Sequence, residues 1–195
     1  MKIILASKSG VRKKILENNQ IMCDVVHSNV DENEVKISLL EAGASPELVS
    51  KNLAELKSNK VSINYPDRIV LGADSVVSLN NKIIDKPKTR EEALNILKKL
   101  NNTVHYLISS VCISKNGSMI WNYSDSSKLK MKNLDISQIK NYLNKIKTET
   151  LLAYGVYQVE ASGLDLFESV NGDMDSIMGL PVKQIKKHLN LLKSL

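Results

Sequence analysis

The segment Ile69-Val70-Leu71-Gly72-Ala73-Asp74-Ser75 is the part of the chain around which the other elements can be arranged. Its apolar first half is typical of a buried strand, and an acid follows where that strand surfaces. Ligands of α/β proteins collect at such strand ends. After a turn at Asn80-Asn81, Lys86-Pro87 follows on a return strand, where the lysine can face the acid. An acid and a lysine that face each other, with small residues just before the acid, suit a phosphate substrate that is bound with a metal.

The N-terminal segment carries a second pattern that points to an anion. Ile3–Ala6 predict a buried strand, Ser7–Gly10 a loop and residues 11–18 a helix. A strand, a serine-rich loop and a helix commonly aim backbone N–H groups at an anion. The sequence does not have the Walker spacing of a P-loop. We therefore expect an anion-binding loop of a different kind.

The rest of the chain alternates between helix and strand patterns. Ser45-Pro46 is expected to open a helix over 46–60, and Thr89 begins a capping box for another. Further helices are predicted around 136–143 and after Pro181, and strands over 22–27, 104–114, 120–123, 128–131, 151–159 and 164–170. This mixed order favours α/β or α+β with some antiparallel pairing. No linker interrupts it, which indicates one domain over residues 1–195.

The composition limits the class of protein. The 195 residues are 43% hydrophobic and 25% charged, which is ordinary for a globular chain, and the net charge of +6 suits anionic substrates. The lysines are scattered and only 4% of residues are aromatic, so a nucleic-acid platform is not expected. No segment is apolar enough to span a membrane, and Cys23 and Cys112 lack metal or disulfide spacing. We predict two buried thiols in a cytoplasmic protein.

Arginine is rare in this chain, which otherwise uses lysine for positive charge. Only Arg12, Arg68 and Arg90 occur. An arginine among lysines can mark a site that needs a planar, forked donor. Arg12 lies beside the serine loop, so we predict that it binds the anion; a solvated helix charge is the alternative. The histidines are scattered along the chain and are given no catalytic role.

Five separated segments resemble, in order, the signatures of the Maf nucleotide pyrophosphatases, and together they extend over nearly the whole chain. They are Leu5–Lys13, Val30–Glu32, Leu53–Lys57, Gly72–Ser75 with Lys86-Pro87, and Gly155–Glu160 with Gly179–Pro181. The resemblance implies a two-lobed mixed α/β fold, like that of the inosine-triphosphate pyrophosphatases, with an elongated mixed sheet and a central cleft. It implies one domain, compatible with a homodimer. The implied reaction is hydrolysis of nucleoside triphosphates, including modified ones, to monophosphate and pyrophosphate with Mg²⁺ or Mn²⁺.

The resemblance also implies roles for individual residues. Asp74 would be the proton acceptor that activates water, and Glu32, with Asp74, would hold the divalent metal. Phosphates would be bound by cations and hydroxyls, namely Arg12, Lys57, Lys86, Ser7 and Ser9. Each residue has a structural alternative: Asp74 can cap a turn, Glu32 can be solvated, Lys57 can lie on a helix surface, and Ser7 can neighbour a helix cap.

Three positions depart from the usual motifs of the family, the last of them from its thymidine/uridine-type branch, and they resemble the family's specificity determinants. They are Val11, Ser75 and Glu160. An apolar residue at 11 and an acid at 160 are similar to the branch that acts on 7-methyl-GTP, because a carboxylate can accept a hydrogen bond from the guanine amino edge. Ser75 matches neither branch.

Two other classes of function stay open at this point. One is a non-catalytic regulator that binds nucleotide or a cell-division partner, since the family is linked to septum formation. The other is a nucleic-acid-binding module, motivated by the positive charge alone. Failure to retain DNA or RNA at moderate salt would dismiss this module, because purely electrostatic binding weakens steeply with salt.

Overall fold

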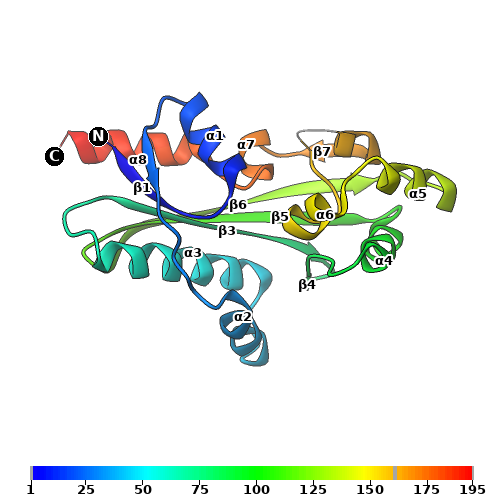
Figure 1. The fold of residues 1–195 in the computed structure, drawn as a ribbon, viewed down its shortest axis with the longest axis horizontal. Coiled ribbons are helices and arrows are strands. Elements are labelled where there is room, and N and C mark those ends of the chain that lie inside the picture. The colour runs from blue at the N-terminus through cyan, green and yellow to red at the C-terminus, as the bar shows by residue number, and fades with distance from the viewer. Residues whose placement is uncertain (1, 160–161, 195) are drawn as a thin grey trace. The chain divides into compact units, whose positions relative to one another are not determined.

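The computed structural model describes residues 2–159 and 162–194 of the chain (Figure 1). The chain divides into two compact units. Unit 1 comprises Met1–Ser75, Ile108–Ser126 and Asp173–Leu195, and unit 2 comprises Val76–Leu107 and Ser127–Gly172. The predicted residues of the site fall in both units.

The strands form a mixed sheet in the order β2-β1-β3-β5-β6-β7, and β4 pairs with β3. Their bounds are β1 Ile3–Ala6, β2 Cys23–Val25, β3 Val70–Leu79, β4 Lys82–Ile84, β5 Val104–Lys115, β6 Ser118–Met131 and β7 Phe167–Asn171. β1 pairs in parallel with β2 and β3, whereas the β3–β4 and β6–β7 pairs are antiparallel. The prediction of a mixed α/β fold with some antiparallel pairing is therefore confirmed.

Helices cover both faces of the sheet in unit 1. They are α1 Gly10–Asn18, α2 Glu32–Glu41, α3 Pro46–Ile63, α7 Met174–Ile177 and α8 Val182–Lys193. Figure 1 shows α3 on one face of the strands and α1 and α8 on the other. The core has two parts because successive side chains of a strand point to opposite faces. Ile3 and Leu5 of β1 pack with α1 and α8, while Ile4 and Ala6 pack with Val61 of α3.

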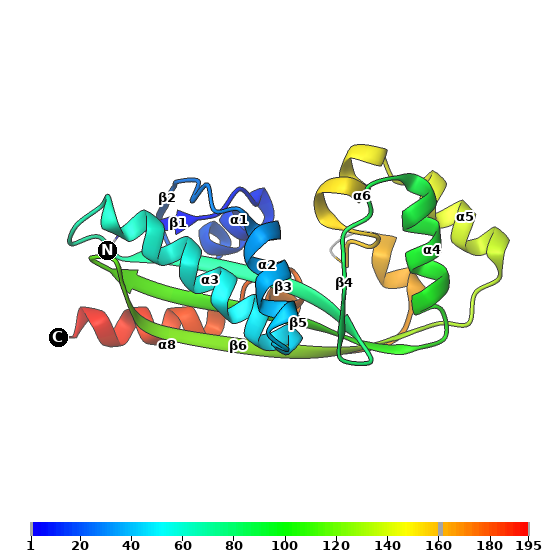
Figure 2. The same ribbon diagram turned by 90° about the horizontal axis from the view of Figure 1, so that it is seen from below.

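Unit 2 contains its own set of helices. They are α4 Arg90–Leu100, α5 Ile136–Asn144, α6 Thr148–Tyr154 and the short 3₁₀ helix η1 Ser162–Leu166. Figure 2 shows α4, α5 and α6 side by side, and α4 contacts both of the others. Arg90 links them by donating hydrogen bonds to the carbonyl oxygens of Leu143 (2.6 Å) and Ile146 (2.9 Å) and to the hydroxyl of Thr148 (3.1 Å).

Several local predictions are wrong. Residues 151–159 do not form a strand: α6 ends at Tyr154, and Gly155 follows with φ 99°, a backbone conformation that favours glycine. The predicted strand 164–170 is partly the 3₁₀ helix η1, whereas the strand expected through 120–123 and 128–131 is present as β6. Cys112 is buried as predicted, but Cys23 is only half-buried.

Helix α2 was not predicted, because its sequence has no clear apolar stripe. In the structure none of its residues is buried. It begins because the Asp31 carboxylate accepts hydrogen bonds from the backbone N–H groups of Asn33 and Glu34, both at 3.1 Å. This is the ordinary N-cap interaction. Within residues 2–159 and 162–194, no helix is long and apolar enough to cross a membrane.

Candidate active site

The two faces of β3 explain which helix each site residue meets. Leu71 and Ala73 belong to the core cluster of α1 and α8, so Gly72 and Asp74 face α3 and Ser75 faces α1. Gly72 is required for this packing: a Cβ atom there would lie 2.1 Å from the carbonyl oxygen of Ala54 on α3. The close approach of strand and helix places Asp74 within reach of α3.

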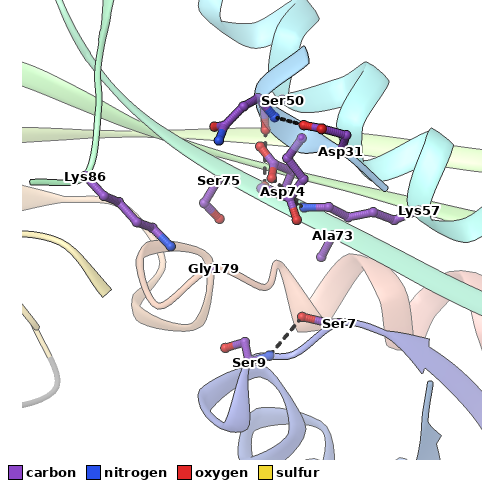
Figure 3. A network of polar contacts seen from close by, with 12 residues as sticks. Ser7, Ser9, Asp31, Ser50, Lys57, Ala73, Asp74, Ser75, Lys86 and Gly179 are labelled. Carbon is purple, nitrogen blue, oxygen red and sulfur yellow. Dashed lines mark hydrogen bonds and ion pairs between the residues drawn. The ribbon is translucent and has the colours of Figure 1, made fainter. Parts of the chain in front are cut away.

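Lys57 of α3 joins two carboxylates. Its Nζ lies 2.8 Å from Oδ1 of Asp74 and 2.9 Å from Oε2 of Glu32, the first residue of α2. The side chains of Lys57 and Asp74 are only 6% and 9% exposed, whereas that of Glu32 is 53% exposed. Figure 3 shows the ammonium group of Lys57 pointing at Asp74. The alternative in which Lys57 lies on a helix surface is therefore wrong.

The electrostatic surroundings of Asp74 act in opposite directions. Burial is the largest effect and raises the pKa of its carboxyl group, while Lys57 and, more weakly, Arg12 lower it. The pKa of Asp74 is consequently above its ordinary value. A carboxylate whose pKa is raised toward neutrality is a better proton acceptor than an ordinary exposed one. Perturbed groups of this kind cluster at functional sites.

Arg12 of α1 joins three segments of unit 1. Its Nε donates to the carbonyl oxygen of Gly179 (2.9 Å), Nη1 to the carbonyl oxygen of Ala73 (3.0 Å), and Nη2 to Oγ of Ser75 (3.1 Å). Nη1 also donates to Oγ of Ser7 at 3.4 Å. The alternative of a solvated helix charge is wrong, because the guanidinium group holds β1, β3 and the turn before α8 together next to Asp74.

The serine loop is ordered by its own hydroxyl groups. Oγ of Ser7 accepts a hydrogen bond from the backbone N–H of Ser9 at 3.2 Å, and Oγ of Ser9 accepts one from the backbone N–H of Arg12 at 3.3 Å (Figure 3). Ser9 is thereby the N-cap of α1. The strand–loop–helix order predicted for an anion site is present. Ser7 also has the structural role that was its alternative, since it bonds the N-cap residue Ser9.

Two predicted specificity residues lie in unit 1. Val11 is half-buried and packs against the core cluster of α1 and α8. Oγ of Ser75 contacts Oγ of Ser109 on β5 at 2.9 Å, in addition to its bond from Arg12. The third, Glu160, lies outside the described residues.

Lys86 belongs to unit 2. Its side chain is exposed, and Nζ donates a hydrogen bond to the carbonyl oxygen of Ala153 in α6 at 2.8 Å. The following residue, Pro87, is buried, so the backbone at this point is anchored. The facing of Lys86 and Asp74 remains a prediction from the sequence.

The carboxylates of Glu32 and Asp74 suit a divalent metal in their chemistry. Both supply hard oxygen ligands, and Lys57 takes only one oxygen of each. Within the described part of the chain, no group of three or more His, Cys, Asp and Glu side chains is placed to hold a metal. A pair of carboxylates fits Mg²⁺ best, because this ion commonly takes its other ligands from water and substrate phosphates.

Sequence reasoning missed two residues near Asp74. Oγ of Ser50 on α3 donates to the backbone carbonyl of Asp74 at 3.1 Å and so fixes the strand at this point. Its spacing of seven residues from Lys57 places both on one face of a helix, a signal that was available in the sequence. The other is Lys36, one turn after Glu32 on α2.

Comparison with known proteins identifies the family. The family model described as "Maf-like protein" matches residues 2–192. The chain belongs to the Maf family. It is 59% identical over 191 residues to a protein of Pelagibacter ubique (strain HTCC1062) named nucleoside triphosphate pyrophosphatase, with 98% of each chain covered.

More distant Maf relatives carry a more specific name. The chain is 37% identical over 182 residues to a 7-methyl-GTP pyrophosphatase of Brucella suis biovar 1 (strain 1330), which covers 93% of this chain and 92% of the relative. Among solved structures, it is similar to that of a HAM1 protein from Coxiella burnetii, with a TM-score of 0.46 and 14% identity over 69% of this chain and 74% of the other.

Proposed function

We propose that this Maf-family chain is a nucleoside triphosphate pyrophosphatase, a hydrolase that releases pyrophosphate and a nucleoside monophosphate. The observation that carries the proposal is the buried contact of Lys57 with Asp74, extended to Glu32. Asp74 lies in the middle of β3, which continues to Leu79 and does not end at the acid as predicted. The proposal is supported by the family and by the name of the Pelagibacter relative. Removal of modified nucleotides from the cellular pool is the biological role that such an activity serves.

Asp74 is the proposed proton acceptor. Lys57 binds its Oδ1, so we assign Oδ2 to the attacking water. The water oxygen forms the new bond to phosphorus, its proton passes to Asp74, and the phosphoanhydride bond between the α and β phosphates breaks as pyrophosphate leaves. Ser50 donates a hydrogen bond to the carbonyl oxygen of Asp74, and Arg12 donates one to the carbonyl oxygen of Ala73. These two bonds hold the backbone of β3 in place at the proposed proton acceptor.

The triphosphate requires several positive groups, because it brings multiple negative charges close to Asp74. We assign this role to Lys57 and Lys86, and to the N–H groups at the start of α1, whose cap is Ser9. Arg12 donates four hydrogen bonds to other described residues, which among them leaves one of its five N–H groups for a phosphate. Its proposed role is therefore first to position Ser7 and β3 and second to bind the anion.

A divalent cation, Mg²⁺ or Mn²⁺, is the proposed cofactor, with Glu32 and Asp74 as the residues that would hold it. When bound, such a cation neutralises developing charge on phosphate oxygens. Glu32 keeps one oxygen that Lys57 does not bind, which supports its part in this assignment. At Asp74 the corresponding oxygen is the one assigned to the attacking water, so Glu32 is the principal proposed ligand.

The base preference has two candidates. A 7-methyl-GTP specificity is supported by the residue types of Val11 and Glu160 in the sequence, and by the names of relatives at 37% identity or below. A broader preference is supported by the name of the more similar Pelagibacter protein. Val11 and Ser75 contact other parts of unit 1, so substitutions there are expected to act on base ranking through the position of α1 and β3.

The testing experiment measures pyrophosphate release from standard and modified nucleoside triphosphates, with Mg²⁺ and with Mn²⁺. The wild type is expected to release pyrophosphate in a metal-dependent way. Asp74→Asn is expected to lose on the order of a hundredfold to ten-thousandfold in kcat, the usual contribution of a general base. Asp67→Asn is the matched control, because the Asp67 side chain is 85% exposed.

Three outcomes would each overturn one part of the proposal: the base, the activity or the base preference. Near-normal turnover in folded Asp74→Asn would remove the assignment of the base. Binding of triphosphates by the wild type without product would favour the regulator that binds nucleotide. Dominant turnover of dTTP or UTP would exclude the 7-methyl-GTP preference but keep the activity.

A further inference from the structure

Helix α2 carries a lysine on its inner face. Val35, Lys36 and Leu39 are the half-buried residues of this helix, and all its other residues are exposed. Val35 and Leu39 line a hollow against Leu56 and Asn59 of α3, which shows that this face of α2 is turned toward α3. A lysine on the inner face of an otherwise exposed helix bears a cost of desolvation that a solvent-facing lysine would avoid.

The position of Lys36 relative to Glu32 is set by the helix. Residues four apart lie on the same face of a helix, one turn apart. Glu32 is itself placed by its 2.9 Å contact with Lys57, which is 2.8 Å from Asp74. Helix α2 therefore places Lys36 one turn from Glu32, whose carboxylate contacts the lysine that binds Asp74.

The electrostatic surroundings of Lys36 agree with this placement. Burial, the largest effect, lowers the pKa of its ammonium group, and the charges of Asp74 and Glu32 raise it. The same two carboxylates that Lys57 bridges thus act on a second lysine from a different helix. Lys57, Lys36, Asp74 and Glu32 bring two positive and two negative charges together.

We propose that Lys36 is a further substrate-binding residue, a second cation that α2 presents to the phosphate chain of the nucleotide opposite Lys57. This inference rests on the proposed function. Because it acts on the phosphates, Lys36 is expected to strengthen binding of every triphosphate equally and to leave the ranking of bases unchanged. No residue of α2 is buried, so the helix can adjust its position around a bound anion with few contacts to break.

The experiment compares Lys36→Met with the wild type in two assays. In the first, KM for the nucleoside triphosphate is expected to rise about tenfold, with a smaller change in kcat, and Lys36→Arg is expected to restore much of the loss. In the second, inorganic triphosphate is used as a competitive inhibitor, and its inhibition constant is expected to rise by a similar factor. Lys51→Met is the matched control, a half-buried lysine on α3.

The outcomes separate this inference from the proposed function. If the wild type hydrolyses triphosphates but Lys36→Met keeps its KM and its inhibition constant, only the role of Lys36 is overturned. A fall in kcat at unchanged KM would likewise overturn it, since Lys36 would then act on Glu32 and not on substrate. If the wild type releases no pyrophosphate, the proposed function fails; direct binding of inorganic triphosphate to the wild type and to Lys36→Met still tests the inference.

Discussion

Asp74 in unit 1 and His105 in unit 2 are both buried titratable side chains, but their surroundings differ. Asp74 lies between cations from two helices, Lys57 and Arg12, and its carboxyl group is part of a charged network. The His105 side chain is fully buried, and its Nε2 lies 3.0 Å from the hydroxyl of Tyr157. Its ring packs with those of Tyr157 and Phe167, at centroid distances of 5.7 and 5.8 Å.

The pKa values reflect this difference. Burial lowers the pKa of His105 to about 4, and no charged partner opposes that effect among the described residues. The histidine is therefore neutral at pH 7 and serves as a packing group. Burial raises the pKa of Asp74, but Lys57 and Arg12 oppose the shift. Asp74 is thus a buried titratable group with specific charged partners, and groups of this kind cluster at functional sites, which is the physical reason to look for chemistry in unit 1.

The largest expected effect comes from removing the central cation of unit 1. Lys57→Met leaves Asp74 buried without its nearest positive partner, and breaking a buried ion pair in this way costs about 3 to 5 kcal/mol. We expect a lower free energy of unfolding and at least a hundredfold lower kcat/KM. Thermal or urea unfolding and pyrophosphate release measure the two effects.

A double variant sharpens the same point. Lys57→Met with Asp74→Asn removes the unpaired charge, so the free energy of unfolding is expected to recover toward that of the wild type while activity stays lost. A double variant as unstable as Lys57→Met alone would mean that the lysine stabilises unit 1 by packing and not by its charge.

The second prediction concerns the neutral histidine of unit 2. The pKa of His105 is about 4 in the folded chain and 6.5 in its ordinary state, so the unfolded chain takes up a proton first as the pH falls. The contribution of neutral, buried His105 to the free energy of unfolding is fully present above pH 6.5 and is lost as the pH falls toward 4. Its size is about 3 kcal/mol, at about 1.4 kcal/mol per pKa unit.

His105→Gln is expected to remove this part of the pH dependence, and urea unfolding between pH 7 and pH 4.5 measures it. His27→Gln is the control, because His27 is exposed. An unchanged slope in His105→Gln would mean that other groups govern the acid sensitivity and that the contrast between the two units is not one of titration.

The smallest expected effect is that of the exposed cation in unit 2. Lys86→Ala is expected to raise KM for the triphosphate about tenfold with a smaller effect on stability, since an exposed lysine contributes little to folding. Lys88→Ala, also exposed and two residues away, is the control. Unchanged KM and kcat in Lys86→Ala would refute its role and confine the triphosphate to residues of unit 1.

The elements that were predicted correctly have strong local signals. The apolar residues of Ile3–Ala6 and Val70–Leu71 are buried strands, and Ser45, Thr89 and Ser9 each cap the helix that follows. Local patterns of this kind need no knowledge of distant contacts. The wrong prediction over 151–159 has the opposite origin: a short apolar run fits a strand and a helix equally well, and only packing distinguishes them.

For the site, the amino-acid sequence alone was enough to select Asp74, since an acid after a buried strand is a local feature that also matches a family signature. It was enough to select Lys57, Glu32 and Arg12 as candidates as well. Which residues these side chains contact depends on the tertiary structure. The alternation of β3 turns Asp74 toward α3 and Ser75 toward α1, and Gly72 lets α3 approach closely enough for Lys57 to reach the acid. Arg12 and Lys57 therefore approach the middle of β3 from opposite faces, because contacts between residues far apart in the chain depend on the packing of whole elements.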